Sequence, residues 1–172
     1  HGAIRDEAFF EWLETELEGL MKLDPELLIH ALERSCAIKA DVVRQDERES
    51  GLRMILNFGH TLGHAVEALK RYRGILHGEA VAIGMAFAAE RSESLGLSPK
   101  GTSDRLVALL RRAGLPTELP AFPRRAYLQA LRVDKKKREA RIRFVALRGI
   151  GRAETVPLLP REIVPPKRAK GR

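Results

Sequence analysis

The chain has 172 residues, of which 44% are hydrophobic and 31% are charged. This composition is typical of one folded globular domain and argues against a disordered chain, and no apolar run is long enough to span a membrane. The formal net charge is +8 at pH 7, with much of the excess in residues 135–138 and in the tail from residue 167. A small anionic substrate and a solvated tail explain this charge at least as well as a nucleic-acid partner.

Six helices are expected in chain order. Their approximate ranges are about 6–21, 24–44, 52–70, 77–95, 102–114 and 124–133. Asp24 followed by Pro25 marks the start of the second helix, because a carboxylate caps the first turn and proline fits within it. The fifth helix is expected to be capped by Thr102 or Ser103. Small residues along the fourth helix would let another helix approach it closely, and Gly96 is expected to end it.

A short β-hairpin is predicted after these helices. Residues 140–148 begin with alternating polar and apolar side chains, residues 149–151 form a glycine-rich turn, and residues 152–158 read as the returning strand. The fold class expected from the pattern is therefore mainly α, as a single multi-helix domain over residues 1–172 with a small β-hairpin.

The single cysteine, Cys36, excludes an internal disulfide and favours a reducing, cytoplasmic location. It lies in a helical pattern near Leu32 and Ile38, so we expect a buried packing residue. The chain has no signal-peptide core and does not begin with Met, which predicts that it starts inside a longer protein.

Three of the five histidines, His60, His64 and His77, lie in one short stretch that also holds the only asparagine, Asn57. His60 and His64 have the i, i+4 spacing that places two side chains on one face of a helix. Imidazole is a common ligand of zinc, and His77 would join the pair if the next helix packs antiparallel to the first. The residues alone leave open which histidines bind a metal, and hydrogen-bonded histidines without a metal are the alternative.

Anion-binding groups are predicted around the same stretch. Arg53 precedes Asn57 by one helical turn, so a guanidinium and an amide could hold a carboxylate or phosphate together. Lys39 and Lys135 are further candidates, although a single lysine is usually a solvated charge. Gly59 and Gly63 each cost about 1 kcal/mol in a helix relative to alanine, which predicts tight helix packing, close approach of a substrate, or both.

Four segments in this order resemble 3-dehydroquinate synthase: residues 46–53 (DERESGLR), 56–65 (LNFGHTLGHA), 77–85 (HGEAVAIGM) and 134–136 (DKK). The resemblance covers nearly the whole chain, but only the family's second, mostly helical domain, and it implies the dehydroquinate synthase-like fold. The family's first domain, which binds NAD, is absent from this chain. So is a glutamate that serves as the third metal ligand, since it would lie just before residue 1.

The resemblance also implies a role for each site residue. His60 and His77 would be ligands of a divalent metal, zinc or cobalt, and His64 would lie in the substrate site. The residues expected to contact substrate are Lys39, Glu49, Arg53, Asn57 and Lys135.

The reaction implied is the NAD- and metal-dependent conversion of 3-deoxy-D-arabino-heptulosonate 7-phosphate to 3-dehydroquinate and phosphate, a lyase step of aromatic amino acid biosynthesis by the shikimate pathway. The complete enzyme would pair this domain with the NAD-binding domain and form a homodimer, and the isolated domain would be inactive. Two alternatives remain: another sugar phosphate cyclase, and a basic helical module that binds nucleic acid through residues 135–138 and the tail.

Overall fold

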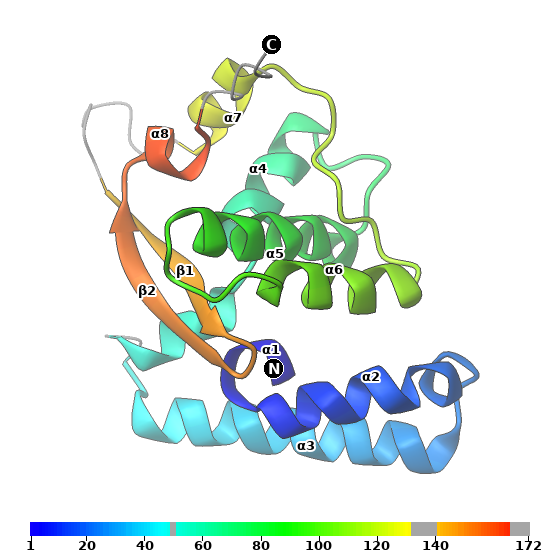
Figure 1. Ribbon diagram of the computed structural model, residues 1–172. Coiled ribbons are helices and arrows are strands. Elements are labelled where there is room, and N and C mark those ends of the chain that lie inside the picture. The colour runs from blue at the N-terminus through cyan, green and yellow to red at the C-terminus, as the bar shows by residue number, and fades with distance from the viewer. Residues whose placement is uncertain (49–50, 132–140, 166–172) are drawn as a thin grey trace.

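The computed structural model describes residues 1–48, 51–131 and 141–165 (Figure 1). The elements, in chain order, are α1 (Gly2–Arg5), α2 (Glu7–Met21), α3 (Pro25–Gln45), the 3-10 helix η1 (Leu52–Asn57), α4 (His60–Leu69), α5 (His77–Ser94), α6 (Thr102–Arg112), α7 (Arg124–Ala130), β1 (Ile142–Gly149), β2 (Arg152–Leu158) and α8 (Pro160–Ile163). The expected mainly helical fold with a small hairpin is confirmed. No helix in the described ranges is both long and apolar enough to cross a membrane.

Helices α2 and α3 form an antiparallel pair along one edge of the molecule (Figure 1). Asp24 caps α3 as predicted, because its side chain accepts hydrogen bonds from the backbone N–H groups of Glu26 and Leu27. Only Ile38 and Val42 of α3 are buried. The prediction that Cys36 is buried is wrong: it is exposed, since α3 is covered along one narrow face only.

Helix α5 is the centre of the fold, because it packs against α4, α6 and β1. Its buried face carries small residues and lets the backbone of α4 come very close. A Cβ atom at Gly84 would lie 1.9 Å from the carbonyl oxygen of Gly59, and one at Gly63 would lie 3.2 Å from the carbonyl oxygen of Ala80. Tight packing of α4 on α5 therefore accounts for Gly59 and Gly63, as expected from the first of the two explanations, helix packing or close approach of a substrate.

The start of α6 differs from the expectation. Gly101, with φ 88°, precedes the helix, and no side chain at that position caps it. The cap comes instead from α5, whose Glu93 Oε1 accepts a hydrogen bond of 2.6 Å from the backbone N–H of Ser103. Thr102 uses its hydroxyl to bond the carbonyl of Pro99 at 2.8 Å. The prediction of Thr102 or Ser103 as the capping side chain is therefore wrong, because a carboxylate distant in sequence occupies that position.

The predicted hairpin is confirmed, with β1 and β2 antiparallel and Ile142 opposite Leu158. Residues 144–147 of β1 are buried against the helices. One buried side chain joins the hairpin to α5: the hydroxyl of Ser92 donates to the carbonyl of Ala88 at 2.7 Å and accepts from the backbone N–H of Leu147 at 2.9 Å. The turn is tied to α1 by the backbone bond from Gly151 N–H to the Ala3 carbonyl, 2.9 Å long.

Replacing Ser92 with alanine is expected to lower the free energy of unfolding by about 1–3 kcal/mol, because the buried N–H of Leu147 would lose its acceptor. Ser94, exposed at the end of the same helix, provides the control. Its replacement with alanine should change stability by less than about 0.5 kcal/mol. Urea unfolding of both variants tests this. A loss of stability in Ser92→Ala as small as that of the control would show that the link between α5 and β1 contributes nothing.

Candidate metal and substrate site

The helix expected over residues 52–70 is broken into η1 and α4. Phe58 leaves the helical region, with φ −56° and ψ 127°, and Gly59 follows in the left-handed region with φ 83°. Glycine adopts that conformation without the steric cost that a Cβ would bring. Because the chain turns here, Arg53 and Asn57 lie on η1 and not on the helix that His60 begins, so the single helix expected over residues 52–70 is wrong.

The three histidines come together at the beginnings of α4 and α5. His60 is the first residue of α4 and His77 the first of α5. The ring centroids of His60 and His64 lie 5.4 Å apart, those of His60 and His77 also 5.4 Å, and those of His64 and His77 6.1 Å. The two helices run in opposite directions where they touch, since Gly59 lies against Met85 and Gly63 against Ala80. The predicted convergence of the three rings is confirmed.

The surroundings of His60 favour its neutral form. Burial lowers the pKa of its imidazole, and the neighbouring His64 and His77 lower it further, while the Phe58 carbonyl opposes this shift. That carbonyl lies 3.4 Å from Nδ1 and can only accept a hydrogen bond, so it favours the proton on Nδ1 and a free electron pair on Nε2. A neutral imidazole with a free nitrogen is the form that binds metal ions.

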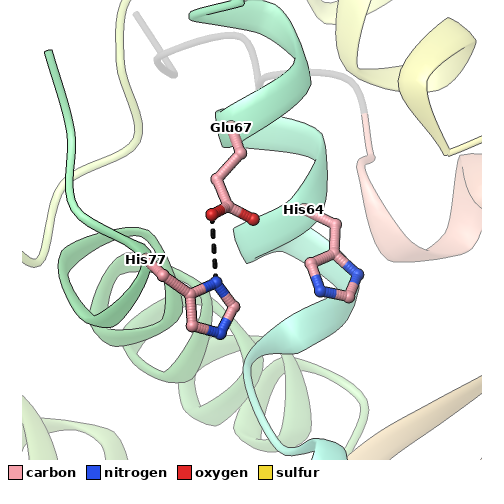
Figure 2. A group of neighbouring side chains, drawn as sticks. All are labelled: His64, Glu67 and His77. Atoms are coloured by element: carbon pink, nitrogen blue, oxygen red, sulfur yellow. Dashed lines mark hydrogen bonds and ion pairs between the residues drawn. The ribbon is translucent and has the colours of Figure 1, made fainter. Parts of the chain in front are cut away.

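Glu67 also belongs to this cluster, although no role is predicted for it from the sequence. Its Oε1 lies 3.0 Å from Nδ1 of His77 (Figure 2). His64, Glu67 and His77 each offer a ligand atom within 4.8 Å of the others, a spacing that could itself hold a metal ion. The signal that could have found Glu67 is its position three residues after His64, on the adjoining face of α4.

The residues predicted to bind anions are more widely distributed. Arg53 is half-buried, and its guanidinium donates to the carbonyl of Glu47 at 2.9 Å. Lys39 is exposed on α3, and Asn57 is exposed at the end of η1. Within the described part of the chain, no hydrogen bond joins Arg53 or Lys39 to the histidines. Glu49 and Lys135 lie outside the described residues.

A buried carboxylate organises the segment that carries Arg53. Asp46 is 9% exposed, and its Oδ2 accepts hydrogen bonds from the backbone N–H groups of Gly51 at 2.8 Å and Arg53 at 3.0 Å. Asp46 therefore fixes the backbone from which Arg53 projects. Asp46 belongs to one of the motifs shared with the family, but its role cannot be predicted from the sequence, because a carboxylate in a run of charges has no distinctive spacing.

Solved structures with the same fold are sugar phosphate cyclases. One is ValA, the 2-epi-5-epi-valiolone synthase of Streptomyces hygroscopicus subsp. jinggangensis 5008 with NAD+ and Zn2+ bound, at a TM-score of 0.80 and 27% identity over 94% of this chain and 46% of that one. Another is 2-deoxy-scyllo-inosose synthase complexed with carbaglucose-6-phosphate, NAD+ and Co2+, at a TM-score of 0.68 and 27% identity over 81% of this chain and 41% of that one. The fold and the histidine cluster together define a dehydroquinate synthase-like domain.

Residues 1–137 match the family described as 3-dehydroquinate synthase C-terminal, and the chain belongs to this family. The 3-dehydroquinate synthase of Acidithiobacillus ferrooxidans is 50% identical over 153 residues, which are 89% of this chain and 42% of that protein. That of Citrifermentans bemidjiense is 52% identical over 151 residues, 88% of this chain and 42% of that protein. The chain thus spans less than half the length of the curated relatives it matches.

Proposed function

We propose that this chain is the metal- and substrate-binding domain of a 3-dehydroquinate synthase. The complete enzyme would convert 3-deoxy-D-arabino-heptulosonate 7-phosphate to 3-dehydroquinate and phosphate, in the cytoplasm and as a step of the shikimate pathway. The observation that carries the proposal is the convergence of the His60, His64 and His77 rings within 5.4–6.1 Å, in a family member about 50% identical to synthases of that name.

The donor set fits a divalent ion such as zinc or cobalt. His60 and His77 would hold it through Nε2, since the Nδ1 atoms face the Phe58 carbonyl and the Glu67 carboxylate. A third ligand would come from residues upstream of His1, as the family resemblance implies. When bound, the ion would acidify a substrate hydroxyl and polarise the ketone formed when NAD accepts a hydride.

The remaining site residues would bind and orient the substrate. His64 is exposed beside the other two rings, where it can donate or accept a proton at the substrate. Arg53, with Lys39 and Lys135, would hold the carboxylate and phosphate of the substrate. Glu49 and Asn57 would bond its hydroxyls. Asp46 would support this set by fixing the backbone at Arg53.

The NAD-binding domain would be the partner of this chain within one polypeptide, and the complete enzyme would be a homodimer. The curated relatives are more than twice as long as the stretch they share with this chain, which leaves room for such a domain. Because the cofactor site would lie in that domain and one metal ligand just before residue 1, this chain alone should release no phosphate. The complete enzyme, given NAD and zinc or cobalt, should do so.

The second candidate is a different sugar phosphate cyclase, favoured by the likeness to the valiolone and inosose synthases. The assay that separates the two offers the complete enzyme 3-deoxy-D-arabino-heptulosonate 7-phosphate, sedoheptulose 7-phosphate and glucose 6-phosphate, and identifies each product. Turnover of the carboxylated sugar alone is the expected result. Preferential turnover of either uncarboxylated sugar phosphate, or rapid phosphate release by the isolated chain, would contradict the proposal.

A further inference from the structure

Glu67 faces the imidazole of His77 from the neighbouring helix. It lies on α4 and His77 begins α5, so the contact also joins the two helices. The Glu67 side chain is only 12% exposed, whereas that of His77 is 58% exposed. The carboxylate is therefore held in place by its surroundings, and the more exposed ring is the partner that it can orient.

The contact with Glu67 determines which nitrogen of His77 is free to bind a metal ion. An ionised carboxylate can only accept hydrogen bonds, so the 3.0 Å contact places the proton on Nδ1 of His77. In the neutral ring, Nε2 then carries the free electron pair, and in Figure 2 it points away from Glu67. His60 has the same arrangement, with its Nδ1 facing the Phe58 carbonyl. Carboxylates and carbonyls that bond the second nitrogen in this way fix the tautomer and orientation of metal-binding histidines.

The competing interpretation makes Glu67 a metal ligand together with His64 and His77, which lie close enough for this. In that arrangement an ion would have to take the place of the proton between Glu67 and Nδ1 of His77. The hydrogen bond would be lost, and Nε2 of His77, which lies on the other edge of the ring, would not bind the ion. His60 is not one of the three residues of that group, and its Nε2 would be left without an ion to bind.

We infer that Glu67 is a positioning residue that orients His77 so that Nε2 faces the metal ion, without itself binding the ion. This inference rests on the metal site of the proposed function. Glu67 would therefore raise the affinity for the metal ion, a role separate from the substrate contacts proposed above.

The test compares Glu67→Ala and Glu67→Gln with the unchanged complete enzyme and with Glu90→Gln, an exposed carboxylate near the far end of α5. Zinc affinity is measured by competition with a chelator at one pH. Glu67→Ala should bind zinc about 10–100-fold more weakly, as loss of such partners usually causes. The zinc affinity of Glu67→Gln should lie between those of Glu67→Ala and the unchanged enzyme, because its amide oxygen still accepts a hydrogen bond from Nδ1. Glu90→Gln should bind zinc as the unchanged enzyme does.

Two further readouts do not depend on activity. The cobalt(II) absorption bands should keep their positions in Glu67→Gln, since the ligand atoms stay the same. In this chain without metal, 15N NMR should find the His77 proton on Nδ1, and Glu67→Ala should shift it toward Nε2. Unchanged zinc affinity in Glu67→Ala, or altered cobalt bands in Glu67→Gln, would overturn the inference. A complete enzyme that binds no zinc at all would instead refute the proposed function.

Discussion

Gly84→Ala is expected to destabilise the protein by about 3 kcal/mol or more, the upper part of the range for overpacked cores. The new Cβ would lie 1.9 Å from the Gly59 carbonyl oxygen and 2.9 Å from the Gly63 nitrogen. Both atoms belong to backbone, so no side chain can rotate away to relieve the overlap. Alanine's better helix propensity, about 1 kcal/mol, is too small to compensate. Urea unfolding followed by circular dichroism gives the free energy directly.

Gly78→Ala is the matched control, because Gly78 lies on the same helix and a Cβ there would meet no atom within 4 Å. It should leave stability unchanged or raise it by up to about 1 kcal/mol. Similar losses of stability in the two variants would mean that the close contact between α4 and α5 is not the cause of the loss at Gly84. A surviving Gly84→Ala protein should also bind metal weakly, since Gly59 directly precedes His60 and would have to move.

His60→Ala and His77→Ala should each abolish metal retention by the complete enzyme. Loss of a ligand atom must cost more than loss of an outer partner, which lowers affinity about 10–100-fold. Metal content after gel filtration, measured by atomic emission, is the readout. The two ring centroids lie 5.4 Å apart, and both Nδ1 atoms face hydrogen-bond acceptors, which leaves Nε2 of each ring for the ion.

Two other histidines separate this result from a general effect of losing an imidazole. His30 on α3 packs against Trp12 with tilted rings whose centroids are 4.5 Å apart, and it lies far along the chain from the cluster. His30→Ala should therefore keep its metal. His64→Ala should also keep its metal but lose activity, because His64 is proposed to act on substrate. Metal loss in His64→Ala with full retention in His60→Ala would favour the group of His64, Glu67 and His77 instead.

The sequence predicted those features that depend on local signals. Asp24 and Pro25 start α3, His77 starts α5, and Gly96 ends it with φ 71°, because capping and left-handed glycine need only neighbouring residues. The hairpin was predictable from the alternating polar and apolar side chains and from the glycine-rich turn between the strands. The i, i+4 spacing placed His60 and His64 together, whereas His77 was expected to join them only if the next helix packed antiparallel to the first.

Features that depend on distant partners were not predictable from the pattern. The pattern predicts a continuous helix through Gly59, because glycine is compatible with both a packed helix and a left-handed turn. Only the contact with Gly84 decides between them. Cys36 was expected to be buried, yet burial depends on what covers α3. The pairing of Glu67 with His77 depends on how α5 returns along α4.

The position of the metal ion in the complete enzyme tests the central claim most directly. In a crystal grown with cobalt(II), the anomalous difference map should show one ion about 2.0–2.1 Å from Nε2 of both His60 and His77. Glu67 should remain on the Nδ1 side of His77 and outside the coordination shell. An ion held by Glu67 and His64, with His60 unliganded, would contradict this account.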